Sequence, residues 1–171
     1  MPTEPNLPVG RNSKGARMSK KKVAIVLGSK SDIGIAEKAE TVLREFGIEF
    51  STHVISAHRN PNKIRKFASG VEKNEIALII AIAGLAAHLP GVLASLTMVP
   101  VIGVPVGCGP LNGQDALYSI AQMPYGIPVA SVGIDNAGNA ALLAVEILAL
   151  SDKSLYDKIR NYRRQFGDDD E

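Results

Sequence analysis

A stretch of 39 residues without any Asp, Glu, Lys or Arg runs from Ile76 to Gln114. Prolines at positions 90, 100, 105 and 110 divide it into segments shorter than the roughly 20 apolar residues that a membrane-spanning helix needs. A parallel sheet covered by helices on both faces can bury such a run. We therefore predict a buried parallel sheet here, and no membrane segment.

Apolar runs alternate with amphipathic helical patterns along the chain. In the first helical pattern, apolar residues from Ile35 to Phe46 recur every three or four positions, between a predicted N-cap at Asp32 and a terminating Gly47. This alternation predicts one domain, a three-layer α/β/α sandwich around a flavodoxin-like parallel sheet of five strands in the order 2-1-3-4-5. The predicted strands are 23–27, 49–55, 76–82, 101–104 and 129–132, and the predicted helices are 32–46, 60–71, 88–98, 112–122, 136–150 and 155–166.

The charges are distributed unevenly. Residues 1–22 hold six Lys or Arg against Glu4, a local net charge of +5, whereas the other 149 residues hold 13 basic and 16 acidic side chains, a net charge of −3. We predict a disordered extension over 1–22, a catalytic domain over 23–167 and an acidic tail over 168–171. A mildly acidic domain argues against nucleic-acid binding. No secretory signal is visible, so we expect a cytoplasmic protein.

Two predicted helices, 88–98 and 136–150, are apolar on nearly every side. A helix of that kind needs cover all round. In a domain this small, that pattern predicts a homo-oligomer.

The turn from Gly28 to Asp32 joins the first strand to the first helix. Its hydroxyls and free amides could hold phosphate oxygens at a helix N-terminus, but an ordinary capped turn uses the same residue types. The turn matches neither a Walker loop nor a dinucleotide fingerprint.

The second strand ends in Ser56-Ala57-His58-Arg59, and the third leads to His88. Ligands bind where parallel strands end. Arginine suits phosphate or carboxylate, and imidazole moves protons near neutral pH. The alternative for His58 is that it is a solvated surface residue. The alternative for His88 is that it starts a helix, with its ring bonded to a backbone carbonyl. His53 lies inside a strand and is predicted to be structural.

Zinc is not favoured. His58, His88 and Cys108 are the only soft ligands with a candidate position, and the single cysteine excludes an internal disulfide. The residues therefore predict acid–base chemistry on a small phosphorylated substrate, without metal or cofactor.

Five motifs together closely resemble the PurE family. They read GSKSD from Gly28, SAHRNP from Ser56, AAHLPG from Ala86, PVIGVPV from Pro100 and DALYSIAQMP from Asp115. The resemblance implies an N5-carboxyaminoimidazole ribonucleotide mutase of purine biosynthesis. It also implies a homo-octamer with sites where subunits meet.

The resemblance also implies roles for individual residues. Ser29 and Asp32 would bind the nucleotide substrate, and Ser31 and Arg59 would face its phosphate. His58 would shuttle the proton, and His88 would be the second catalytic residue. Together with His88, the remaining residues would line the site or surround the carboxylate and the transient CO2, namely Ser56, Ala57, Ala83, Gly84 and Leu89.

The chain departs from typical bacterial members at Ile82 and Leu85, where they have glycine, a variation typical of archaeal-type members. The loop 133–138 is also shorter than in many relatives. Two alternatives stay open. One is direct carboxylation of aminoimidazole ribonucleotide (AIR) with CO2, although the third loop lacks the Ala-Gly-Arg-Ser-Asn of that class. The other is a non-enzymatic module that binds a mononucleotide.

Overall fold

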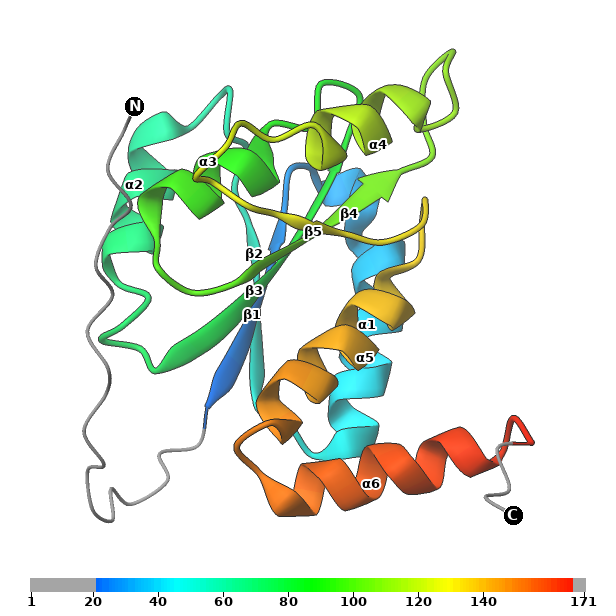
Figure 1. Ribbon diagram of the computed structural model, residues 1–171. Coiled ribbons are helices and arrows are strands. Elements are labelled where there is room, and N and C mark those ends of the chain that lie inside the picture. Colours follow the sequence, from blue (N-terminus) through cyan, green and yellow to red (C-terminus); the bar gives the residue numbers. More distant parts are fainter. Residues whose placement is uncertain (1–20, 168–171) are drawn as a thin grey trace, which may run out of the picture.

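The computed structural model describes residues 21–167, so the predicted acidic tail and almost all of the predicted extension lie outside the described residues. Five parallel strands form one sheet in the order β2-β1-β3-β4-β5, which confirms the predicted order (Figure 1). The strands are β1 (Lys22–Leu27), β2 (Phe50–Val54), β3 (Ile76–Gly84), β4 (Val101–Val106) and β5 (Ala130–Ser131).

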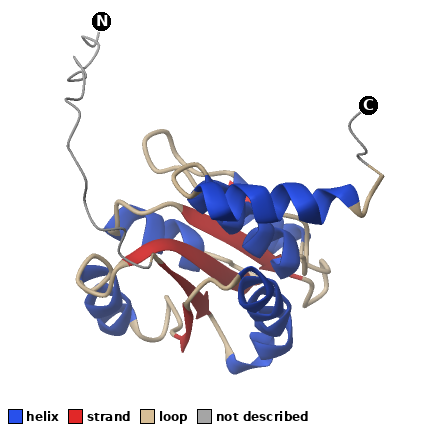
Figure 2. Cartoon of the chain, turned by 90° about the horizontal axis from the view of Figure 1, so that it is seen from below, coloured by secondary structure: helices blue, strands red, loops and turns tan. Residues whose placement is uncertain are grey.

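Helices cover both faces of the sheet, as Figures 1 and 2 show. One face carries α1 (Ile33–Phe46), α5 (Ala137–Ala149) and α6 (Lys153–Arg164). The other carries α2 (Pro61–Ser69), α3 (Leu89–Leu96) and α4 (Gln114–Ala121). The predicted three layers are confirmed.

Strand β1 shows why its sequence is apolar throughout. Val23, Ile25 and Leu27 point into the core shared with α1 and α5, whereas Ala24 and Val26 point into the core shared with α2 and α3. All five are fully buried. Successive strand residues face opposite sides, so a strand covered on both faces has no position for a polar side chain.

The start of α1 differs from the prediction. A 3-10 turn over Lys30–Asp32 precedes the helix, and the Ser29 hydroxyl accepts a hydrogen bond from the backbone N–H of Ser31. Asp32 occupies the residue before α1, but its side chain makes no capping hydrogen bond. The carboxylate is engaged by the Ser31 hydroxyl instead. Gly47 ends the helix with φ of 72°, as predicted.

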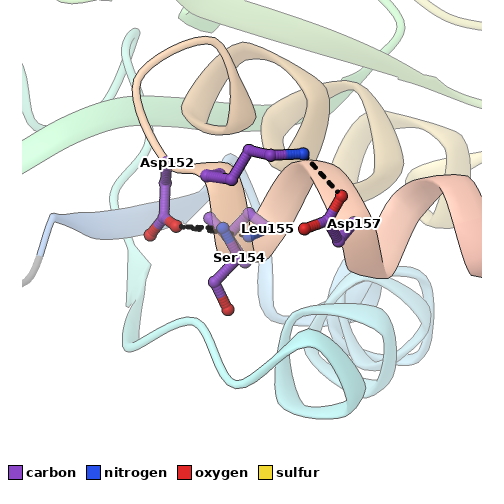
Figure 3. Close-up of polar contacts among 5 residues, drawn as sticks. Asp152, Ser154, Leu155 and Asp157 are labelled. Atoms are coloured by element: carbon purple, nitrogen blue, oxygen red, sulfur yellow. Dashed lines mark hydrogen bonds and ion pairs between the residues drawn. The ribbon is translucent and has the colours of Figure 1, made fainter.

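Helix α6 covers α5 within the same chain. It begins at Lys153, two residues before the prediction, because Asp152 accepts hydrogen bonds from the backbone N–H groups of Ser154 and Leu155 (Figure 3). Ile159 of α6 packs into the same core as α5. The all-apolar character of α5 is therefore explained inside one subunit, and it no longer argues for an oligomer.

Lys22, which the predicted extension included, is the first residue of β1, and its ammonium lies 2.7 Å from a carboxylate oxygen of Glu49. Strand β1 therefore begins one residue earlier than the predicted 23–27. Within residues 21–167, no helix is both long enough and apolar enough to cross a bilayer.

Candidate active site

The loops that follow β1, β2, β3 and β4 surround a cleft of about 360 Å³ at the carboxyl ends of the strands. Neighbouring parallel strands end at the same edge of the sheet, so their loops converge there. All eleven residues that the sequence predicted for the site line this cleft, namely Ser29, Ser31, Asp32, Ser56, Ala57, His58, Arg59, Ala83, Gly84, His88 and Leu89.

The turn after β1 holds a buried carboxylate. Asp32 is 6% exposed and is the one buried polar or charged side chain among residues 21–167. The Ser31 hydroxyl donates to Asp32 Oδ1 at 2.8 Å and lies 2.9 Å from the Ser29 hydroxyl. A carboxylate has room for several hydrogen bonds. Asp32 is therefore suited to accept hydrogen bonds from the hydroxyl groups of a ligand.

Two histidines meet at the cleft. His58, on the loop after β2, places Nε2 2.8 Å from Nδ1 of His88, which directly precedes α3. The ring centroids are 4.9 Å apart and the planes cross at 71°. One nitrogen must donate and the other must accept, so at least one ring is neutral while the bond exists. Both histidines are exposed in the isolated chain. Such a pair can hold a proton and present it to a ligand.

Arg59 follows His58 in the chain and lies two residues before α2 begins. Its backbone N–H and its Nε lie 3.3 Å and 3.4 Å from the Ser56 hydroxyl, which orients the loop. The guanidinium is on an exposed residue and offers a planar set of donors at the rim of the cleft. This arrangement suits a phosphate at the outer end of a ligand.

Small residues of β3 and the loop after β4 form another part of the cleft wall. A Cβ atom on Gly84 would lie 2.5 Å from Sγ of Cys108, and a Cβ on Gly109 would lie 2.6 Å from Cδ2 of Leu85. Leu85 has φ of 54°, a conformation that costs a branched side chain energy. The ends of β3 and β4 therefore interlock without spare space.

The cleft also includes residues that were not predicted for the site, namely Gly28, Leu85, Ala86 and Cys108. Gly28 and Ala86 lie inside recognised motifs, so the motifs themselves could have indicated them. Cys108 was considered only as a metal ligand. Its position follows from the parallel sheet, because β4 lies next to β3 and ends at the same edge. Within residues 21–167, no group of three or more His, Cys, Asp or Glu side chains is placed to hold a metal ion.

A larger hollow of about 530 Å³ lies at the opposite end of the sheet, between α1 and α6. Its lysines are already engaged, since Lys158 donates to the carbonyl of Phe46 and Lys21 donates to the Ser151 hydroxyl. It contains no histidine. The smaller cleft is therefore the candidate active site.

His53 lies on β2, away from the cleft. Its Nε2 is 2.9 Å from the Ser51 hydroxyl, and its ring packs against Phe67 at a centroid distance of 5.0 Å. Burial lowers the pKa of His53, and the charge of Lys63 lowers it further. A neutral ring packed in this way fits the predicted structural role.

The fold and the cleft define a flavodoxin-like α/β protein with a small cleft where its strands end. The family model described as AIR carboxylase matches residues 22–169, and the chain belongs to this family.

Relatives with this architecture support the assignment. The N5-carboxyaminoimidazole ribonucleotide mutase of Pyrococcus abyssi is 54% identical over 83% of this chain and 82% of its own. The mutase of Escherichia coli K12 is 48% identical over 87% and 89%. The crystal structure of Treponema denticola PurE superimposes with a TM-score of 0.80 at 34% identity, covering 86% of this chain and 92% of that one.

Proposed function

We propose that this protein is an N5-carboxyaminoimidazole ribonucleotide mutase of de novo purine biosynthesis. The observation that carries the proposal is the hydrogen-bonded pair of His58 and His88 in the cleft that also holds buried Asp32. The curated relatives with this activity, at about half identity over most of the chain, support the same reaction.

The substrate is a sugar phosphate carrying an imidazole ring, and the cleft offers a partner for each part. Asp32, with Ser29 beside it, accepts hydrogen bonds from the ribose hydroxyls. Ser31 and Arg59 face the phosphate. Ser56 and Ala57 line the same cleft. This orientation brings the aminoimidazole ring to His58.

The reaction has two proton steps. In the first, the bond between N5 and the carboxylate carbon breaks, its electron pair stays on N5, and His58 gives N5 a proton, which leaves AIR and CO2. In the second, C4 of AIR attacks the CO2 carbon, and His58 takes the proton that C4 then loses. The imidazole ends as it began. Proton transfer from a positioned side chain contributes about 10²–10⁴-fold in rate.

His88 influences where the proton of His58 resides, through the hydrogen bond between the two rings. When Nε2 of His58 donates to Nδ1 of His88, Nε2 of His88 already carries the hydrogen of its neutral ring, so an added proton resides on Nδ1 of His58 without breaking the 2.8 Å bond. The pair thus keeps one mobile proton close to the substrate through both steps. Leu89, the first residue of α3, closes the apolar side behind His88.

Released CO2 must stay beside C4 until it is recaptured. Ala83 and Gly84 provide small, apolar walls that leave little room for water. Holding the two reactants together supplies much of the remaining rate through proximity. No cofactor takes part in this scheme.

The cleft is open in one subunit, so the proposal includes a homo-octamer whose neighbours cover it. Large apolar side chains support contacts between subunits, because Met98 is 92% exposed, Tyr118 is 61% exposed and Tyr125 is fully exposed. Light scattering on the purified protein measures the mass, and eightfold the subunit mass is expected. The proposal also places the enzyme in the cytoplasm, where nucleotides are made.

The proposed reaction is tested by incubating the protein with N5-carboxyaminoimidazole ribonucleotide and measuring the 4-carboxy product. Product above the uncatalysed rate is expected, and its absence overturns the proposal. AIR with CO2 is the second substrate. Faster turnover of this pair, with none of the carbamate, would establish direct carboxylation instead. A flavin absorption spectrum in the purified protein, without either turnover, would point to a mononucleotide-binding module.

A further inference from the structure

We propose that Asp135 is a positioning residue, which holds the loop after β4 so that Cys108 closes the wall of the cleft against Gly84. Asp135 lies between β5 and α5 and does not line the cleft. The inference rests on the proposed function only where it concerns CO2. The placement of the loop is independent of the reaction.

Asp135 makes two hydrogen bonds to the end of β4. Its carboxylate Oδ1 accepts from the backbone N–H of Gly107 at 2.8 Å, and its own backbone N–H donates to the carbonyl of Pro105 at 2.9 Å. Lys38 of α1 donates to the Asp135 carbonyl at 3.3 Å. One residue therefore connects the end of β4 to the segment before α5 and to α1.

The backbone conformation of Asp135 is energetically unfavourable for a residue other than glycine. Its φ is 58°, in the left-handed region where glycine is comfortable and most side chains are not. Glycine would satisfy that backbone better than aspartate. What aspartate adds is the carboxylate, and the carboxylate is bonded to Gly107. The backbone conformation of the turn therefore does not call for aspartate, whereas the hydrogen bond to Gly107 does.

The contact continues from Gly107 into the cleft. A Cβ on Gly107 would lie 2.6 Å from Oδ2 of Asp135, so the loop passes directly against the carboxylate. The next residue is Cys108, whose Sγ fills the space beside Gly84. Gly107 and Cys108 are adjacent in the chain, so releasing the Gly107 N–H leaves the bond from the backbone N–H of Cys108 to the carbonyl of Val106, at 3.0 Å, to hold the residue that forms the wall.

A looser wall has a specific consequence for the proposed reaction. CO2 held between Ala83, Gly84 and Cys108 would escape to solvent more often before C4 recaptures it. Binding of the nucleotide, which uses the loops after β1 and β2, would change little. Loosening the wall should therefore lower the fraction of CO2 that is recaptured and leave KM nearly unchanged.

Cys108 itself provides the test, because it is the only cysteine in the chain. Its alkylation rate by iodoacetamide is measured on the full-length protein in the parent, Asp135→Gly and Asp135→Asn. Asp135→Gly removes the carboxylate while relieving the backbone, and Asp135→Asn keeps an acceptor oxygen. Glu75→Gly is the matched control, since Glu75 has the same φ of 58° at the other end of the sheet.

We expect alkylation to rise about fivefold in Asp135→Gly, the change that the loss of one ordinary hydrogen bond produces. Asp135→Asn and Glu75→Gly should react like the parent. Thermal melts verify that each variant is folded, and Asp135→Gly should melt no lower than the parent. An unchanged alkylation rate in Asp135→Gly, or an equal increase in Asp135→Asn, overturns the inference.

A second experiment tests whether the wall formed by Cys108 affects the retention of CO2 in the proposed reaction. Substrate labelled with ¹³C in its carbamate is converted in unlabelled bicarbonate, and the label kept in the product is measured. Asp135→Gly should lose about fivefold more label than the parent at a similar KM. If the parent makes no product, the proposed function fails while the alkylation result still decides the role of Asp135. Equal label loss in parent and Asp135→Gly overturns the link to CO2.

Discussion

Replacing Gly84 by alanine tests how tightly the cleft is built. The added Cβ would lie 2.5 Å from Sγ of Cys108 and 3.2 Å from Cβ of Val106. Carbon and sulfur atoms do not approach to 2.5 Å, so either the Cys108 side chain or its loop must move. Overpacking of this kind typically costs about 1–3 kcal/mol. At roughly 2–4 °C per kcal/mol for a chain of this size, Tm should fall by several degrees.

The double variant Gly84→Ala/Cys108→Ala identifies the cause. Removing Sγ removes the shortest contact and leaves the one with Val106, which requires a shift of only a few tenths of an ångström. Differential scanning calorimetry on the parent, both single variants and the double variant gives the coupling between the sites. A favourable coupling of about 0.5–3 kcal/mol is expected for neighbours in contact. Additive effects, or a Gly84→Ala protein as stable as the parent, would refute the close packing of the wall.

Three further predictions concern the scaffold. Gly103→Ala should destabilise the protein by about 1–3 kcal/mol in denaturant titrations, because its Cβ would overlap Cγ2 of Ile120 on α4. Asp152→Ala should cost about 1 kcal/mol by the same titration through loss of the α6 cap, whereas an unchanged midpoint would contradict the bonds drawn in Figure 3. His53 has a lowered pKa in the folded chain, so its protonation favours unfolding, and stability falls as the pH drops below its ordinary value of 6.5. His53→Phe should make the melting temperature less dependent on pH between about pH 5 and pH 7, and an unchanged slope would contradict this.

The fold was largely predictable because its central strands, β1, β3 and β4, are buried on both faces. A run such as Val23–Leu27 has no place in a surface strand, and alternation with helical patterns leaves few topologies. Local electrostatics was harder to predict. Lys22 belongs to a basic run that resembles a tail, and its place in β1 depends on backbone pairing with β3 and on an ion pair with Glu49, 27 positions away.

The site was predictable where short motifs concentrate its chemistry. His58 and Arg59 are adjacent in sequence, and a strand ends just before them. Cys108 was missed because a lone cysteine in a glycine-rich loop has no pattern of its own, and its place depends on which strand neighbours β3. The prediction for Asp32 was right about its position, because Asp32 is the N-cap residue of α1, but its side chain makes no capping hydrogen bond. Ser29 caps the short 3-10 turn before α1, and the carboxylate of Asp32 lines the cleft.

The central claim is that the imidazole of His58 carries the proton for carboxylate transfer. The most direct measurement compares the parent with His58→Asn, using the carbamate substrate and the rate of appearance of the 4-carboxy product. The account predicts that His58→Asn keeps the parent melting curve and loses about 10²-fold or more in rate, the contribution of a positioned proton donor. A folded His58→Asn enzyme that turns over at the parent rate would contradict it.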